Sequence, residues 1–414
     1  MKRTWTSRLA ILALAAVVVV SFAACGGGAK PKATFFWATY DGLTEDFRAS
    51  LETAFNKASP DAQIQVVPIS WTDMQNKVTT SLAGGTPPDI SVVGTRWLLD
   101  YMGTNSIEDV SKYVSKETLD NINPAAMEAK IKGKLMGVPV AAGARIMAIN
   151  NKLTKAVPKT MEELEADAKK VAKPGKVYGL IMPGKSYTEL TDFAYYLYSA
   201  GGDFFAVNAD GTYGKCTVNS DAGVKALTFM AQLALKDKVV QDGFTSQIRT
   251  DAHPVFYAGK AAYVFIGAWV ESAMKQAKSD FPVTYALIPP FAGQKQSGLV
   301  ITDSIAFFTK GKQLKAAGKF IDFFYKDEWK GKFDQLVGFP PVTLSAAKDP
   351  FWQTPLYKAL IEASLSAKPW PLVDHFDTLN TLVWTACEKV FQGQASPKDA
   401  LDEAAAAVDK SRGL

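Results

Sequence analysis

The distribution of apolar residues predicts strands that alternate with helices in the first part of the chain. Short apolar runs, which are typical of strands, stand at 34–38, 63–69 and 90–93. Between these runs apolar residues recur about every fourth position, as on one face of a helix; they are Leu43, Phe47, Leu51 and Phe55 over 43–57, and Met74, Val78 and Leu82 over 71–83. Parallel strands need a crossover between them, so the alternation predicts an α/β fold with mainly parallel sheets flanked by helices.

The alternation continues toward the C-terminus. A strand is expected at 146–149, and a helix is expected to begin after Thr160. The Thr160 hydroxyl can cap this helix, and the Glu163 side chain, three residues later, can accept from the backbone N–H of the cap residue. Further helices are expected at 188–200, 220–236, 268–278, 315–326 and 378–391. Glycine and proline are scattered rather than gathered in a long linker, which favours two lobes joined by short crossings.

The first 25 residues look like an export signal. Lys2, Arg3 and Arg8 precede an apolar stretch over 9–20, and small residues lead to Cys25. A transmembrane helix is the alternative, but the stretch is short for the roughly 20 residues that span a bilayer. The ending resembles a bacterial lipobox, so we expect a signal peptide over 1–24, a lipid on Cys25 and a flexible tether over 25–33. A simple cleaved signal with an incidental cysteine is the other reading.

Composition and charge exclude several classes of protein. The chain is 48% hydrophobic and 21% charged, as in ordinary globular proteins. Its formal charge of +5 falls to +2 without the three cations near the N-terminus, so no nucleic-acid partner is expected. With two His and three Cys, neither a metal nor another cofactor is expected. Cys216 and Cys387 could form a disulfide in an oxidising compartment or remain two buried thiols.

The chain carries no convincing catalytic motif. It has no His-Glu-x-x-His, Gly-x-Ser-x-Gly or Cys-x-x-Cys sequence, so we expect no enzyme. His253 and His375 are interpreted as structural or surface residues. The stretch 179–186 fits a phosphate-loop expression, but 177–182 has the pattern of a strand and Pro183 removes one N–H from the loop. Nucleotide binding is therefore not expected.

Aromatic residues gather near the ends of the expected elements. They are Trp37, Tyr40, Trp71, Trp97, Tyr187, Trp269, Trp352 and Trp370. An aromatic ring offers a flat apolar face, and a sugar ring has an apolar C–H face inside a rim of hydroxyls. As a group these residues favour carbohydrate binding, although core packing is the better interpretation of any single one.

Several sequence landmarks resemble one family in its own order. They are the AGG-x-PD stretch at 82–90, the G-K-x-Y-G-V-P hairpin at 132–139, the N-K…P-x-T-W-x-E-L stretch at 150–164, the F-x-x-G-K-A-A…G-x-W stretch at 256–269, the A-A-x-x-F-I-x-F helix at 315–324, the G-x-x-P crossing at 338–341 and the closing G-x-x-S-P-x-E-A-L at 393–401. Over 34–410 the chain resembles the extracellular solute-binding proteins of ABC importers, in the class similar to maltose-binding protein.

The resemblance implies a two-lobed, type II-like periplasmic-binding-protein fold with three hinge crossings, near 141–145, 301–304 and 340–344. The first lobe would hold 34–142 and 304–341, and the second 143–303 and 342–414. A monomer anchored by its lipid to a bacterial membrane would face the periplasm or the cell exterior. It would close on a sugar or oligosaccharide and deliver it to ABC permease subunits. A polyol or glycerophosphate-type solute, a secreted lipoprotein hydrolase and a receptor without a transporter are the alternatives.

The resemblance also implies ligand-binding positions. Trp37 and Tyr40 would face the cleft after the first strand, Arg96 would donate to hydroxyls, and Trp97 and Trp269 would stack. The full expected set is Trp37, Tyr40, Thr95, Arg96, Trp97, Arg145, Tyr187, Trp269, Asp303 and Asp374. Arg145 and Asp303 lie at crossings, where a charge contacts ligand or pairs across the cleft.

Overall fold

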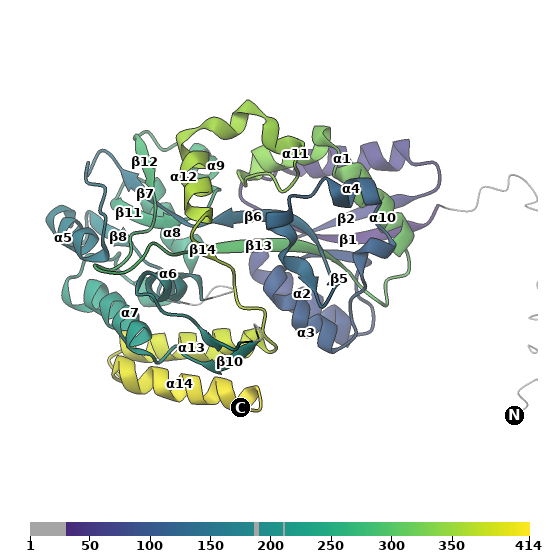
Figure 1. The fold of residues 1–414 in the computed structure, drawn as a ribbon. Helices are drawn as coiled ribbons and strands as arrows, with labels where there is room; N and C mark the ends of the chain where they lie inside the picture. The colour runs from purple at the N-terminus through teal and green to yellow at the C-terminus, as the bar shows by residue number, and fades with distance from the viewer. Residues whose placement is uncertain (1–29, 186–189, 210–211) are drawn as a thin grey trace, which may run out of the picture.

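Two lobes stand side by side in the computed structural model of the protein (Figure 1). The structure describes residues 30–185, 190–209 and 212–414. Cys25 and Tyr187, and with them the expected lipid site and one expected ligand contact, lie outside the described residues. Each lobe is built on its own sheet, of six strands in the first and four in the second.

The sheet of the first lobe mixes parallel and antiparallel neighbours. Its strand order is β14-β13-β3-β1-β2, with β6 also paired to β13. The strands are β1 (Lys32–Ala38), β2 (Gln63–Ile69), β3 (Ile90–Gly94), β6 (Val138–Ala144), β13 (Gly298–Phe307) and β14 (Ala367–Lys368). β1 runs parallel to β2 and β3, whereas β13 runs antiparallel to β3 and β6.

Helices cover this sheet with the faces that the sequence predicts. α1 (Glu45–Ala58) buries Phe47, Leu51 and Phe55, and α2 (Trp71–Ala83) buries Met74 and Val78. A hydroxyl caps the start of each helix: Thr44 Oγ1 accepts from Phe47 N in α1, and Ser70 Oγ accepts from Asp73 N in α2. The other helices of this lobe are α3 (Leu98–Gly103), α4 (Lys116–Asp120), α10 (Leu314–Phe324) and α11 (Asp327–Val337).

The sheet of the second lobe has the order β12-β7-β11-β8. Its strands are β7 (Ile146–Asn150), β8 (Tyr178–Ile181), β11 (Ala261–Ile266) and β12 (Val283–Ala286). β7 is antiparallel to both neighbours, and only β8 and β11 are parallel. The prediction of mainly parallel sheets is therefore wrong in detail, because β7 pairs antiparallel with β11 and β12, and β13 pairs antiparallel with β3 and β6.

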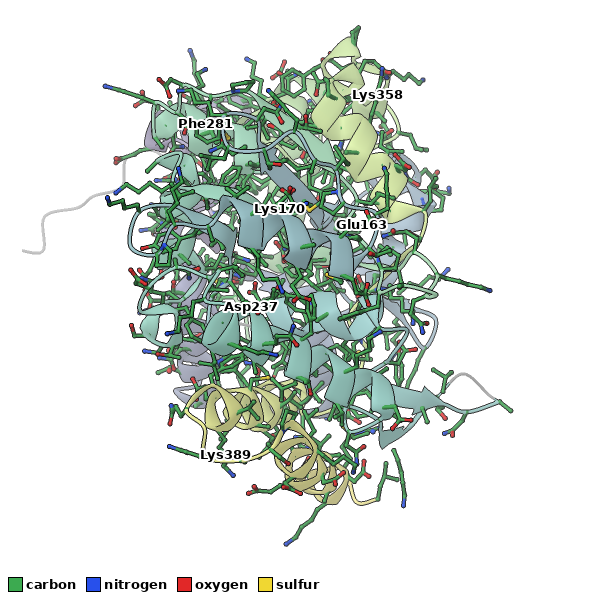
Figure 2. All side chains as sticks on the ribbon, turned by 90° about the vertical axis from the view of Figure 1, so that its left-hand side faces the viewer. Glu163, Lys170, Asp237, Phe281, Lys358 and Lys389 are labelled. Carbon is green, nitrogen blue, oxygen red and sulfur yellow. The ribbon has the colours of Figure 1, made fainter. Side chains whose placement is uncertain are left out.

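The helices of the second lobe pack around its sheet and extend below it in Figure 1. They are α5 (Met161–Val171), α6 (Thr191–Ser199), α7 (Asp221–Ala231), α8 (Arg249–Tyr257), α9 (Val270–Gln276), α12 (Pro355–Ser364), α13 (Phe376–Phe391) and α14 (Pro397–Ser411). The Thr160 hydroxyl accepts from the Glu163 N–H, as predicted, but the Glu163 carboxylate accepts from Lys159 N rather than from the cap itself. Figure 2 shows the outer face of this lobe, where Glu163 and Lys170 of α5 are exposed.

Two short hairpins and a set of short helical turns complete the chain. The hairpins pair β4 (Lys130–Ile131) with β5 (Lys134–Leu135) and β9 (Phe205–Val207) with β10 (Tyr213–Cys216). α7 continues directly into a π-helical turn, Gln232–Lys236. The stretch that fits the phosphate-loop expression begins inside β8, at Gly179, as the strand interpretation predicts.

β6 and β13 pair with each other where the chain passes between the lobes. Arg145 follows β6 directly, and its N–H donates to Leu299 O on β13. Farther on, Asn123 N donates to Val342 O and Leu344 N donates to Asn121 O. The lobe boundary predicted after residue 341 therefore cuts a segment that is hydrogen-bonded to the first lobe.

The two cysteines that the structure describes are separate thiols. Cys216 and Cys387 are both buried and free, so the second of the two alternatives holds. In the parts of the chain that the structure describes, no helix has both the length and the apolar character needed to cross a membrane.

Candidate functional site

A cavity of about 470 Å³ lies between the lobes and draws its lining from both. Its first-lobe side is formed by Thr39, Tyr40, Asp41, Ser70, Trp71 and Thr72. Its second-lobe side is formed by Arg249, Thr250, His253, Pro254, Tyr257, Trp269, Ala273, Gln276 and Ala277, and Arg145, Ile301, Asp303 and Phe339 complete it. Small-molecule sites commonly occupy about 300–1,000 Å³ at such domain interfaces.

The first-lobe wall presents a stack of aromatic rings. Tyr40 follows β1 and Trp71 opens α2, so both stand where a strand gives way to the next segment. The Tyr40 and Trp71 rings stack with centroids 6.0 Å apart, and Trp71 stacks on Trp97 at 5.6 Å. Trp97 is buried while Trp71 is half-buried, so the stack starts in the core and ends at the cavity.

The Tyr40 hydroxyl is fixed by a carboxylate on the cavity floor. It donates to Asp303 Oδ2 at 2.9 Å. Burial raises the pKa of Tyr40 well above its usual value, and the Asp303 charge raises it further. Tyr40 therefore stays protonated and keeps Asp303 in one orientation.

The second-lobe wall is formed by one face of α8 together with Trp269 and residues of α9. Arg249, His253 and Tyr257 follow one another at intervals of four residues, which places them in a row along the helix. All three line the cavity. Arg249 and Tyr257 are half-buried and His253 is buried.

Trp269 holds two guanidinium groups against its ring. The Arg145 guanidinium carbon lies 4.8 Å from the Trp269 ring centroid, and that of Arg249 lies 4.9 Å from it. The His253 ring lies nearly parallel to Trp269 at 6.5 Å. Trp269 is only 7% exposed, so in this structure its ring serves as a platform for cations rather than as an open stacking surface.

The His253 imidazole is uncharged at neutral pH in this setting. Burial lowers its pKa well below the usual value, and the charges of Arg249 and Arg145 lower it further. The imidazole can therefore both donate and accept a hydrogen bond toward the cavity.

Four of the residues expected from the sequence come together here, namely Tyr40, Arg145, Trp269 and Asp303. Trp37 does not face the cavity. It lies inside β1, fully buried, with its ring 5.0 Å from Phe35 and 5.2 Å from Phe324. Residues two apart share a face of a strand, and this face of β1 is packed into the core.

The turn after β3 lies beside the cavity rather than in its lining. Thr95 and Ser304 share a hydrogen bond of 2.7 Å between their hydroxyls. The Arg96 guanidinium carbon lies 4.7 Å from the Trp97 ring and 5.8 Å from the Phe376 ring of α13, so it packs where the lobes meet. Thr95, Arg96 and Trp97 are all buried, and Asp374 is exposed outside the cavity.

Sequence reasoning did not single out Asp41, Arg249, Tyr257 or Phe339, and it left Trp71 undecided. Residues 249, 253 and 257 show a four-residue spacing in the sequence. This spacing identifies one face of a helix, but it is the same whether that face packs on a core or lines a cavity. Trp352 and Trp370 are core residues, packed on Tyr357 and Phe376. Within the described ranges no group of His, Cys, Asp and Glu side chains could hold a metal ion.

Known proteins resemble this chain over nearly its whole length. A putative binding protein of Brucella abortus (strain 2308) is 27% identical over 415 residues, covering 98% of each chain. The galactooligosaccharide-binding protein of Bacillus subtilis (strain 168) is 26% identical over 423 residues and 96% of each. The maltose/maltodextrin-binding domain of Bdellovibrio bacteriovorus, solved with maltotriose, superposes with a TM-score of 0.81 at 21% identity, covering 92% of this chain and all of that one.

The superposition confirms the predicted two-lobed fold. Residues 40–331 match the family described as bacterial extracellular solute-binding protein. This match takes in Tyr40, Trp71, α8, Trp269 and β13. The chain therefore belongs to the bacterial extracellular solute-binding proteins, a family of binding proteins rather than of enzymes.

Proposed function

We propose that the protein captures a saccharide in the cavity between its lobes and delivers it to the membrane permease of an ABC importer. The observation that carries this proposal is the lining of the cavity. Tyr40 and Trp71 offer half-buried aromatic surface to the C–H face of a sugar, while Arg145, Arg249 and Asp303 offer donors and acceptors for its hydroxyls. The galactooligosaccharide-binding relative supports the same class of solute.

The mechanism is closure around the solute. A sugar that contacts Trp71 of one lobe and Tyr257 of the other gains both sets of contacts only when the lobes are together. Contacts made in one state alone shift the equilibrium toward that state. The closed lobes then present the surface that a permease distinguishes from the open form.

Thermal melts of the soluble chain beginning at Gly26 test the solute class. The panel holds neutral mono- and oligosaccharides, polyols and glycerophosphodiesters. A solute that binds only the folded protein stabilises it by about 2.7 kcal/mol at a hundredfold excess over Kd. We expect a shift with at least one saccharide. Shifts with glycerophosphodiesters alone would contradict the proposal.

Matched tyrosine variants locate the binding site. Tyr257→Ala removes a half-buried ring that lines the cavity, and Tyr213→Ala removes a half-buried ring on β10 that packs on Phe205 instead. The saccharide shift should shrink in the first variant and persist in the second. Equal shifts in both would place the solute elsewhere.

We further propose that the protein is exported, acts as a monomer and is held at the membrane by a lipid on Cys25. The basic start, the apolar stretch and the small residues before this cysteine support the anchor. Labelled palmitate should enter the wild-type chain and not Cys25→Ser, which should leave the membrane fraction. Label retained in Cys25→Ser would contradict the anchor.

A further inference from the structure

The ionised groups of the cavity balance one another. Among the described residues of its lining, Arg145 and Arg249 are cationic and Asp41 and Asp303 are anionic. Arg145 and Asp303 are buried at the floor, whereas Arg249 is half-buried and Asp41 exposed nearer the rim. The floor of the cavity therefore holds one charge of each sign, and so does its outer part. His253 adds none, because its pKa is lowered by burial and by both arginines.

Three of these four charges, those of Arg145, Arg249 and Asp303, are held in position. Both guanidinium groups rest on the Trp269 ring, at 4.8 and 4.9 Å from its centroid, and Asp303 accepts from the Tyr40 hydroxyl. Arg145 and Asp303 are 4% and 6% exposed. A solute therefore meets a fixed arrangement of charges, and neither floor group can turn out to water to accommodate a new one.

We infer that the cavity selects uncharged polyhydroxylated solutes and disfavours their acidic and amino-bearing analogues. A sugar hydroxyl donates to a carboxylate and accepts from a guanidinium, so it fits between opposite charges without altering their sum. A carboxylate or an ammonium group on the solute adds a charge that no described lining residue is left to balance once the lobes close. An unbalanced charge in a closed site is costly.

This inference rests on the proposed saccharide function, and the test separates the two. Calorimetric titrations compare D-galactose with D-galacturonate and D-galactosamine, and D-glucose with D-glucuronate and D-glucosamine, at one ionic strength. We expect the neutral sugar of a series to bind at least about tenfold more tightly than its two charged analogues. Equal or tighter binding of a charged analogue overturns the inference and leaves the saccharide function standing. No binding of any member counts against both.

Two variants shift the balance in opposite directions. Asp303→Asn keeps an oxygen to accept from Tyr40 but removes a negative charge, so the uronate should gain at least about fivefold relative to the neutral sugar. Arg249→Gln removes a positive charge from the half-buried position, so the amino sugar should gain instead. Because Arg249 lies nearer solvent, its effect should fall with added salt more than that of Asp303.

The control has the same charge change outside the cavity. Asp120→Asn removes an exposed carboxylate of α4 that pairs with Lys116. It should leave the preference among neutral, acidic and amino sugars as in the wild type. If Asp120→Asn moves the preference as far as Asp303→Asn does, net charge and not the cavity sets the selection, and the inference fails. Arg249→Gln keeps this test decisive even if Asp303→Asn does not fold.

Discussion

The first-lobe wall of the cavity comes from the ends of strands, whereas the second-lobe wall comes from the faces of two helices, α8 and α9. Tyr40 and Trp71 follow β1 and β2, and their rings continue a stack that begins in the core at Trp97. Arg249, His253 and Tyr257 lie in a row on α8 and face Trp269 or the space beside it. The first wall thus presents half-buried aromatic rings, and the second combines aromatic rings with a cation, Arg249.

The difference shows that two tryptophans in one cavity have different tasks. Trp71 is half-buried and keeps part of its surface available, while Trp269 is 7% exposed and is covered by two guanidinium groups. We therefore expect Trp71 to contact the solute directly, and Trp269 to act on it through the two arginines whose guanidinium groups it positions.

The largest effect should come from truncating the two tryptophans in turn. Trp269→Ala empties a buried site and should lower the free energy of unfolding by about 3 kcal/mol. Trp71 is only half-buried and loses fewer protein contacts on truncation, so Trp71→Ala should lower the free energy of unfolding by about 1 kcal/mol. Urea unfolding without solute measures both. Equal losses in the free energy of unfolding would contradict the inference that Trp269 is a buried platform and Trp71 a partly exposed ring.

A double-mutant cycle measures the cation platform itself. Arg249→Ala and Trp269→Ala should show a coupling of about 0.5–2 kcal/mol in unfolding, because each removes the other's partner. Arg249→Ala combined with Trp97→Ala, in the first-lobe stack, should be additive within about 0.5 kcal/mol. Additivity in the first pair would contradict the platform.

The lowered pKa of His253, in the second-lobe wall, should make the stability of the protein depend on pH. The pKa of His253 in the folded protein lies well below its unfolded value of about 6.5. Unfolding therefore takes up a proton below about pH 6.5, so the contribution of His253 to stability is present above that pH and lost as the pH falls below it. From pH 7.5 to 5.5 the wild type should lose about 1 kcal/mol more than His253→Gln. Identical profiles of the two chains in urea unfolding would show that the imidazole does not resist protonation.

The smallest effect is expected at Tyr40. Tyr40→Phe keeps the ring in its stack and removes only the bond to Asp303, so stability should fall by about 0.5–1 kcal/mol. The emission of the neighbouring Trp71 should change little. A loss as large as that of Trp269→Ala would mean that the hydroxyl, rather than the ring, holds the first wall together.

Local periodicity predicted most elements, because it depends on neighbours along the chain. β2 and α2 have the predicted bounds, and α1 buries the predicted face. The direction of β7 was not predictable in this way, since it is set by pairing with β11 and β12, which come more than a hundred residues later. The same holds for residues that touch the opposite lobe.

The site divides along the same line. Tyr40, Arg145, Trp269 and Asp303 were expected from the family resemblance, and all four line the cavity. Trp37 was misplaced because it shares a strand face with Phe35, and the sequence does not say which face of β1 is covered. The α8 row was missed because only the opposite lobe makes that helix face a cavity wall.

The buried thiols make the protein suitable for conversion into an optical sensor. Cys387 is fully buried and Cys216 is 6% exposed, and burial raises the pKa of Cys216 to about 11. The thiolate is the reactive form, so neither side chain competes well for a maleimide. In the chain beginning at Gly26, a single Thr72→Cys on the exposed edge of the cavity lining would carry the dye. Its brightness would then report solute capture without substitution of Cys216 or Cys387.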